Sequence, residues 1–111
     1  MVHEMKLQDK YFNAILSGKK TIELRLYDEK RRQVKVGDTI IFRHMEMDKT
    51  IETEVIALHK FSSFEELYKN FDKEKLGYKE DEIANPEDMK QYYSKEQIEV
   101  FGVVGIEFKK K

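Results

Sequence analysis

The chain has 111 residues, a formal net charge of −1, 39% charged residues and no cysteine. A chain of this length forms one domain with a modest core, so we take residues 1–111 as a single domain. The lack of cysteine excludes disulfides, thiolate nucleophiles and cysteine metal sites. No apolar run is long enough to span a membrane, and we expect a cytoplasmic protein. The bias toward Lys and Glu is compatible with a thermophilic source.

Charge is unevenly distributed along the chain. Residues 1–43 carry 10 Lys/Arg against 6 Asp/Glu, whereas residues 63–88 carry 4 against 9. A protein with a net charge near zero has little general attraction for duplex nucleic acid, so any basic surface is local. The three histidines show no ligand spacing, and we expect neither a metal nor a cofactor.

The first third of the chain shows strand and helix patterns in turn. A short strand is predicted at residues 4–7. A helix follows, in which apolar residues recur at helical spacing, with Asp9 as its N-cap and Gly18 where the C-terminal cap needs a positive φ. A second strand is predicted at residues 21–27, and the polar run 28–35 is predicted to be a loop.

The middle of the chain predicts two longer strands and a helix. The strands are expected at Thr39–His44 and Ile51–Phe61, which are rich in apolar and β-branched residues. Ser63 and Glu66 have the spacing of a capping box, which opens a helix that reaches about Phe71.

An irregular acidic loop is predicted at residues 76–84. Asn85 is then expected to cap a short helix, with Pro86 at its first position, that ends near Tyr93. A further turn is expected to start at Ser94.

A final strand is predicted at residues 103–109, with Val104, Ile106 and Phe108 pointing inward. The pattern therefore indicates about five strands with helices inserted at two places. This α+β arrangement fits a small β-barrel with helices packed at one end. Periodicity alone does not distinguish a barrel from an open sheet.

The second predicted strand carries the most informative pattern in the chain. Because successive side chains of a strand point to opposite faces, one face is predicted to be apolar and buried. That face consists of Ile22, Leu24 and Leu26. The opposite face carries Thr21, Glu23 and Arg25, with Lys20 at the strand entrance. Such a row can bind a polar planar ligand, take part in proton transfer, or form a solvated face with cross-strand ion pairs.

The pattern Gly-x-Lys-x-x-Glu-x-Arg, formed by Gly18, Lys20, Glu23 and Arg25, resembles the signature of the ASCH family. This is the domain homologous to part of activating signal cointegrator 1, and it is related to PUA domains. Further segments agree in order along the chain: Met5–Leu7, Tyr11-Phe12, Lys30-Arg31, Gly37-Asp38, Ser63-Phe64, Tyr92–Ser94 and Phe101–Ile106. The chain is most similar to the small single-domain prokaryotic members. The resemblance implies a small PUA-like β-barrel of about five strands with helices at one end.

The resemblance also implies that Lys20, Glu23 and Arg25 line a cleft between barrel and helices. Arg25 would hold a phosphate, a carboxylate or a base edge, and Glu23 would accept from an exocyclic amine. Lys20 would pair with Glu23 or, if desolvation lowers its pKa, act as a base. Thr21 joins them as a candidate ligand-binding residue. The expected ligand is single-stranded or structured RNA, a nucleoside or a nucleotide, bound by a monomer.

Other candidate contacts lie outside this signature. Lys30, Arg31 and Arg32 can meet a phosphate backbone or form an ordinary solvated loop. Tyr78 and Tyr93 can stack on a base or cover the core. For Tyr92 we favour a place in the core.

Two alternatives stay open. An enzymatic branch of the family hydrolyses the acetyl amide of N4-acetylcytidine, and it has a Lys and an Arg at the positions of Lys20 and Arg25. That branch has a Thr where this chain has Glu23, and a late Glu for which Glu82 is the candidate here. Lys20, Glu23 and Glu82 would then be the catalytic residues. The third interpretation is a protein-interaction module whose acidic segment 63–88 contacts a basic partner.

Overall fold

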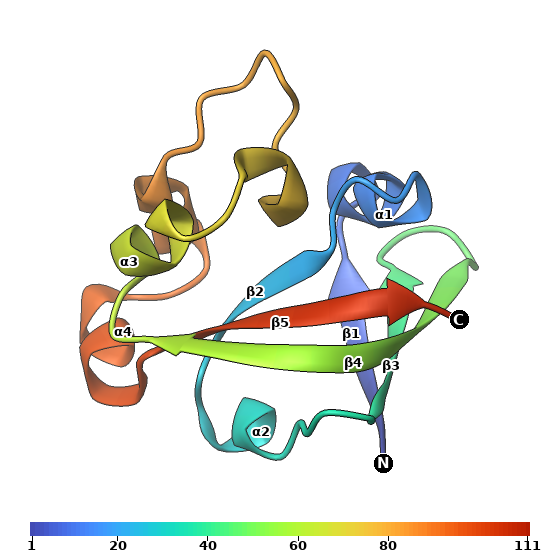
Figure 1. Cartoon of the computed structure of the whole chain (residues 1–111), viewed down its shortest axis with the longest axis horizontal. Coiled ribbons are helices and arrows are strands. Elements are labelled where there is room, and N and C mark those ends of the chain that lie inside the picture. The colour runs from blue at the N-terminus through green and yellow to red at the C-terminus, as the bar shows by residue number, and fades with distance from the viewer.

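The computed structural model describes residues 1–111, and its strands form a single curled sheet (Figure 1). The elements in chain order are β1 (Val2–Leu7), α1 (Asp9–Leu16), β2 (Ile22–Leu26), α2 (Glu29–Arg32), β3 (Thr39–His44), β4 (Thr50–Phe61), α3 (Phe64–Lys69), the 3-10 helices η1 (Lys73–Leu76) and η2 (Pro86–Gln91), α4 (Lys95–Phe101) and β5 (Val103–Lys110). None of the helices is long and apolar enough to cross a lipid bilayer.

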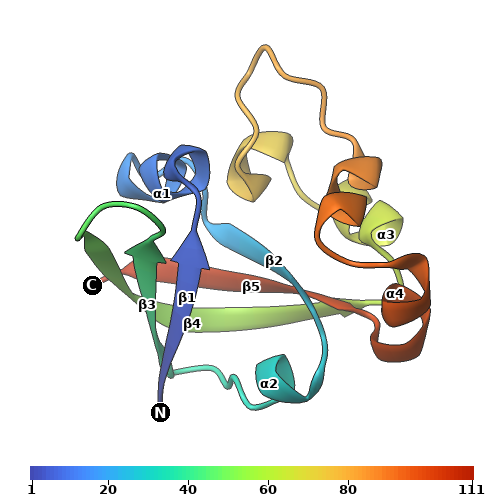
Figure 2. The same cartoon turned by 180° about the vertical axis from the view of Figure 1, so that it is seen from behind.

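The strands are ordered β1-β3-β4-β5-β2 across the sheet. β1 runs parallel to β3, and the other neighbours are antiparallel. β1 and β2 are therefore the two edges, and no ladder joins them. The sheet is a half-barrel with helices, which confirms the predicted α+β class (Figure 2).

The long strand β4 holds the two halves of the sheet together. Its first part pairs with β3, and it pairs with β5 from Thr53 to Phe61. The register with β5 shifts between Val55 and Ala57. Such a bulge bends a strand and increases its twist, which is how a single sheet can curl.

The apolar core is divided into two clusters by the sheet. The larger cluster consists of Met5, Leu7, Phe12, Ile15, Val34, Ile40, Phe42, Ile51, Val55, Val104, Ile106 and Phe108. It contains the three β5 residues that were predicted to point inward. The smaller cluster joins β2 and β5 to the late helices and consists of Ile22, Leu24, Phe64, Leu67, Leu76 and Val103.

Both faces of β2 are covered. Residues directly opposite each other in an antiparallel pair point to the same face. Glu23 lies opposite Ile106 and Arg25 lies opposite Val104, so this acidic–basic pair shares its face with the larger cluster. The predicted apolar face is buried, and Ile22 on that face packs against the late helices rather than inside the curled sheet.

Several helix boundaries differ from the predicted ones. Gln8 rather than Asp9 is the N-cap of α1, because the Asp9 carboxylate is bonded to the His44 ring at 2.8 Å. The predicted loop 28–35 contains the one-turn helix α2, whose first turn is capped by the Asp28 side chain.

The late helices begin where their caps were predicted. Ser63, Asn85 and Ser94 each accept a hydrogen bond from the first turn of α3, η2 and α4. The segment after Asn85 is a 3-10 helix that ends at Gln91, and α4 extends for seven residues rather than one turn. Leu76 belongs to η1 and is buried, so it is not part of the acidic loop.

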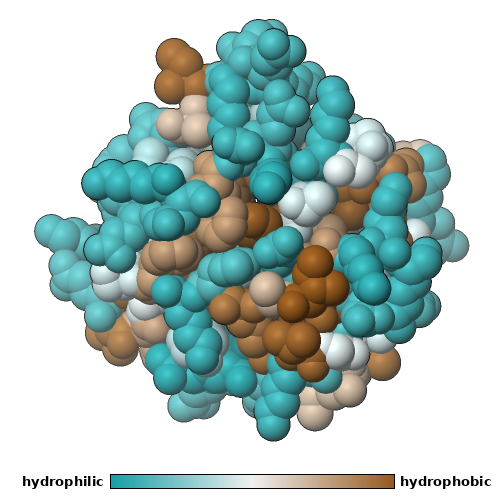
Figure 3. Space-filling model, viewed as in Figure 1, coloured by the Kyte–Doolittle hydropathy of each residue, from teal (hydrophilic) through white to brown (hydrophobic).

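The face of the molecule drawn in Figure 3 is mostly hydrophilic. The face drawn in Figure 3 shows apolar side chains in a small area over β4 and β5, with polar and charged side chains around them. On β4 the exposed apolar residue is Ile56, which lies at the bulge and is 40% exposed. Single exposed apolar residues of this kind are normal for a folded domain.

Ile22→Ala tests the helical-side cluster. Ile22 is 1% exposed, so we expect its truncation to leave a cavity and to lower the free energy of unfolding by about 2–5 kcal/mol. Val100→Ala is the matched control, because Val100 is 72% exposed. Urea unfolding of both variants measures the effect, and equal stabilities would show that β2 does not depend on this packing.

Candidate ligand-binding site

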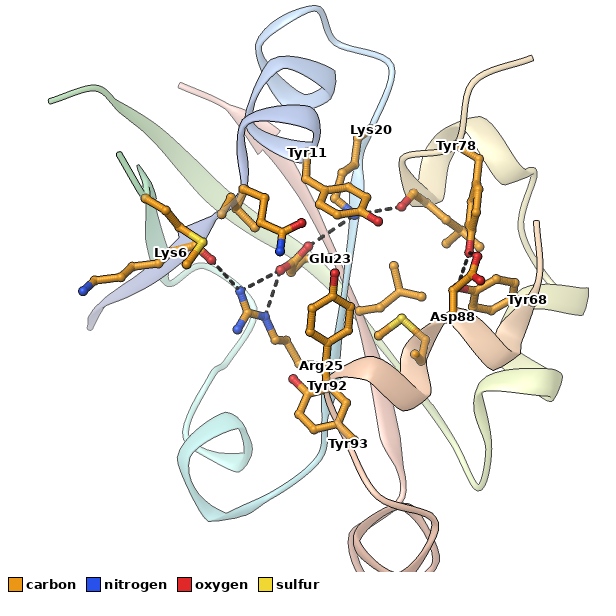
Figure 4. A pocket seen from close by; sticks show the side chains of 16 residues that line it. Lys6, Tyr11, Lys20, Glu23, Arg25, Tyr68, Tyr78, Asp88, Tyr92 and Tyr93 are labelled. Carbon is orange, nitrogen blue, oxygen red and sulfur yellow. Dashed lines mark hydrogen bonds and ion pairs between the residues drawn. The ribbon is translucent and has the colours of Figure 1, made fainter. Parts of the chain in front are cut away.

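A pocket of about 240 Å³ lies where the edge strands β1 and β2 face η1 and η2 (Figure 4). Segments that are far apart in sequence contribute to it. The lining residues are Lys6, Leu7, Gln8, Tyr11, Lys20, Glu23, Leu24, Arg25, Met45, Tyr68, Leu76, Tyr78, Asp88, Met89, Tyr92 and Tyr93. The Lys6 ammonium extends away from the other labelled side chains.

Lys20, Glu23 and Arg25 form a buried ionic triad at one end of this pocket. The Arg25 Nε and Nη2 atoms both lie 2.8 Å from Glu23 Oε2. Lys20 Nζ lies 3.2 Å from Glu23 Oε1. Glu23 and Lys20 are almost fully buried, whereas 16% of the Arg25 side chain is exposed. The three residues that the signature singled out therefore meet in one place.

The Lys20 ammonium has a partner for each of its hydrogens. Its Nζ donates to the carbonyl of Ile22 at 2.7 Å and to that of Leu76 at 2.9 Å, and it pairs with Glu23. An ammonium has three donors and no lone pair, so this arrangement uses all of them. Burial lowers the pKa of Lys20, and the charge of Glu23 opposes that shift. The protonated form of Lys20 requires three hydrogen-bond acceptors, and these three groups supply them.

Opposing effects set the charge state of the other two members. Burial alone would raise the pKa of Glu23, but the charges of Arg25 and Lys20 outweigh it and lower the pKa. Burial would lower the pKa of Arg25, but the Glu23 carboxylate outweighs it and raises the pKa. Glu23 is therefore a carboxylate and Arg25 a guanidinium at neutral pH.

Arg25 also joins the two edges of the sheet. Its Nη2 donates to the carbonyl of Lys6 on β1 at 3.3 Å. Because β1 and β2 share no ladder, this side chain connects edges that backbone pairing leaves apart. The Nη1 amino group of Arg25 forms no ion pair, and the Tyr93 hydroxyl lies near enough to Arg25 to help raise its pKa. Glu23 uses three of its roughly four lone-pair positions. One acceptor position on Glu23 is therefore free.

Two glycines place Lys20 in this site. Gly18 has a φ of 86° and follows α1, so the chain can turn toward β2. Gly77 has a φ of 107° and follows η1. A Cβ at Gly77 would lie 3.0 Å from the Tyr11 ring and 3.1 Å from Lys20 Cδ. The absence of a side chain lets the η1 segment close over the lysine. Gly18 was predicted as a cap, whereas Gly77 was missed.

Five of the six tyrosines in the chain line the pocket. Tyr78 is there as a candidate from the sequence. The core position predicted for Tyr92 is wrong: its side chain lines the pocket and the residue is 45% exposed. Sequence reasoning missed Tyr11, Tyr68 and the carboxylate of Asp88, whereas Tyr93 was weighed together with Tyr78. Their spacing within the helices carried no signal that they would converge.

Three of these tyrosines, Tyr11, Tyr68 and Tyr78, have a raised pKa and stay protonated at neutral pH. Burial raises the pKa of Tyr11 to about 12, and nearby Tyr92 and Tyr68 add to the rise. Burial also raises the pKa of Tyr68 and of Tyr78. Each of these phenols is therefore a neutral ring with a hydroxyl donor.

The remaining candidates lie outside the pocket lining. Thr21 contributes backbone bonds to Lys75 and Phe108. Glu82 pairs with Lys10 on α1 and accepts from the backbone of Lys79.

The basic segment lies on and around α2, also away from the pocket lining. Arg31 pairs with Asp28 at 3.0 Å. Arg32 donates to the carbonyls of Tyr27 and Phe101. Lys30 is exposed and has no ion-pair partner.

Each histidine is bonded to a single carboxylate, and no group of three potential metal ligands occurs. The pairs are His3 with Asp38, His44 with Asp9 and His59 with Glu107.

Comparison with known proteins identifies the family. The profile of the ASCH domain matches residues 5–111. The chain belongs to the ASCH domain family. No curated protein matches it.

Three solved structures are similar to this ASCH domain. Hypothetical protein PH0355 is 38% identical, with a TM-score of 0.84 and full coverage of both chains. Protein PF0455 from Pyrococcus furiosus is 35% identical, with a TM-score of 0.75 over 99% of this chain and 97% of that one. An ASCH domain from Lactobacillus crispatus is 17% identical, with a TM-score of 0.70 over 98% of this chain and 79% of that one, and shares the fold.

Glu23→Gln tests the ionic triad. It leaves two buried cations without their counter-charge, so we expect the free energy of unfolding to fall by about 3–5 kcal/mol at pH 7. The folded-state pKa of Glu23 lies below its ordinary value of 4.5. Its stabilising contribution is therefore complete above pH 4.5 and is lost as the pH falls through the folded-state pKa. When the free energy of unfolding is measured from pH 7 to pH 3, the values for the wild type and for Glu23→Gln should converge as the pH falls.

Glu87→Gln is the control for that experiment. Glu87 also pairs with a lysine three residues away, Lys90, but both side chains are 55% exposed. We expect little change at any pH, because an exposed pair is screened by solvent. A Glu23→Gln protein as stable as this control would contradict the role assigned to the triad.

Proposed function

We propose that this ASCH domain binds one unstacked nucleobase, from RNA or from a free nucleoside or nucleotide, in the tyrosine-lined pocket. The observation that carries the proposal is the convergence of five tyrosines on a small pocket that ends at the Glu23–Arg25 pair. The ASCH fold is of a nucleic-acid-binding type, which agrees with this ligand class.

The size of the pocket supports a single base. Pockets for drug-sized ligands are typically about 300–1,000 Å³, and this one measures about 240 Å³. It accommodates a base or a nucleoside, whereas a duplex does not enter. A net charge of −1 also argues for recognition of a base rather than a broad electrostatic hold on the backbone.

The chemistry of the lining supports the same class of ligand. Aromatic rings stack on any base, with about 1–3 kcal/mol per stacked base. The Arg25 Nη1 amino group can donate to a ring nitrogen or carbonyl, and the remaining Glu23 lone pair can accept from an exocyclic amine. Glu23 and Arg25 present an acceptor beside a donor, which matches a base edge better than a phosphate, whose oxygens only accept.

The amidohydrolase alternative gains no support from this arrangement. Lys20 has no lone pair while its three hydrogens are bound by acceptors. Glu82 is paired with Lys10 rather than with the triad. Glu23 occupies the place where the enzymatic branch has a threonine hydroxyl.

Tyr92→Leu tests base stacking. We expect it to weaken binding by about 1–3 kcal/mol, because Tyr92 lines the pocket and is partly exposed to an incoming ring. Calorimetric titration with the four ribonucleosides and with single-stranded A, C and U pentamers measures the change. Tyr27→Leu is the matched control, since Tyr27 is the tyrosine outside the pocket. If no nucleoside or pentamer binds to the wild type, the proposal fails and a protein partner becomes the better explanation.

Variants of the basic residues around α2 distinguish binding of an RNA strand from binding of a single base. We propose that Lys30 and Arg32 meet the RNA backbone beyond the bound base. Lys30→Ala with Arg32→Ala should then weaken pentamer binding equally for all sequences and leave nucleoside binding unchanged. The slope of log K against log salt should become shallower by about 0.7 for each lost phosphate contact. Pentamer affinities at two salt concentrations decide this, and unchanged slopes would place the backbone elsewhere.

A further inference from the structure

A second carboxylate, Asp88 of η2, lines the pocket away from the ionic triad (Figure 4). The labelled side chains form two polar groups. Glu23 and Arg25 belong to one group, and Asp88 lies with Tyr68 and Tyr78 in the other. Apolar and aromatic side chains complete the lining between them. This pocket therefore has two polar ends, and the proposed function uses only one of them.

The hydrogen bonds around Asp88 have a defined direction. The Tyr78 hydroxyl lies 2.8 Å from Asp88 Oδ2 and 2.8 Å from the Tyr68 hydroxyl. A carboxylate only accepts, so the single hydroxyl hydrogen of Tyr78 goes to Asp88. The Asn85 carbonyl is a more distant acceptor, at 3.3 Å. Tyr68 must then donate to the oxygen of Tyr78.

This direction leaves the Tyr68–Tyr78–Asp88 chain with no hydrogen to donate to a ligand. Both phenolic hydrogens are used within it. Asp88 lines the pocket and the protein donates no hydrogen bond to its Oδ1 atom, so this oxygen is an available acceptor. A ligand must therefore present a hydrogen-bond donor to Asp88. A group that only accepts would place its oxygen or nitrogen against the carboxylate oxygen, which is unfavourable.

We propose that Asp88 accepts a hydrogen bond from the ribose 2′-hydroxyl and thereby selects ribonucleosides and RNA over their deoxy counterparts. This inference rests on the proposed function. With the base edge at Glu23 and Arg25, the sugar lies toward the other polar end of the pocket. A hydroxyl on a rotatable bond is a donor that a carboxylate readily receives, as acidic residues do for ribose in dinucleotide sites. Within a strand the 2′-hydroxyl is the sugar donor that distinguishes RNA from DNA.

The test compares sugars that differ at one position. Wild-type protein is titrated with the ribonucleosides and with the A, C and U pentamers, each as ribose, 2′-deoxy and 2′-fluoro forms. We expect the 2′-deoxy and 2′-fluoro forms to bind about 10- to 100-fold more weakly, because neither offers a 2′-hydroxyl donor to Asp88. Fluorine discriminates between donor recognition and sugar shape, since it keeps the ribose-like pucker but does not donate.

Asp88→Ala assigns the effect to the residue. It removes the carboxylate acceptor, while the Tyr78 hydroxyl keeps the Asn85 carbonyl, 3.3 Å away, as an acceptor. We expect the ratio of ribose to deoxyribose affinity to fall toward one. Glu87→Gln is the matched control, because Glu87 is the neighbouring carboxylate and pairs with Lys90 outside the pocket. It should keep the wild-type ratio.

The outcomes separate this inference from the function on which it rests. Equal binding of the three sugar forms to the wild type overturns the role of Asp88 and leaves base binding intact. A wild-type ribose preference that persists in folded Asp88→Ala protein also overturns it. Lack of binding by every form overturns the proposed function itself. The wild-type comparison alone decides the sugar preference if Asp88→Ala does not fold.

Discussion

The structure depends on one carboxylate held between two cations. Glu23 is 5% exposed and has Lys20 on one oxygen and Arg25 on the other. Burial of three charges is costly unless every charge finds partners, and here backbone carbonyls of Ile22, Leu76 and Lys6 complete the set. The same contacts tie β2 to η1 and to the opposite sheet edge. These contacts fix the positions of the segments that line the pocket.

The local features of the fold were predictable because they depend on neighbours in sequence. The caps at Ser63, Asn85 and Ser94 need only the residues of the following turn, and the alternation along β2 needs only the pleat. The failure at Asp9 has a long-range cause, since His44, 35 residues away, takes the carboxylate that would otherwise cap α1. Local propensity is overridden wherever a distant partner offers a stronger bond.

The candidate site divides in the same way. The triad could be named because its three members lie within six residues and match a signature. The burial of the triad could not be predicted from the sequence, because the register with β5 decides that Glu23 shares a face with Ile106. Tyr68 and Asp88 illustrate the rest: they come from α3 and η2 and meet only through Tyr78. No periodicity in either helix indicates a contact across 20 residues.

Arg25 contacts the opposite edge of the sheet and also lines the pocket. Its guanidinium bridges the unpaired edges through the Lys6 carbonyl. A ligand that contacts Arg25, as we propose, would therefore touch the side chain that connects β1 to β2. Fluctuations that separate these two edges would move that side chain, so the flexibility of the sheet edge and the lifetime of the bound ligand would be coupled.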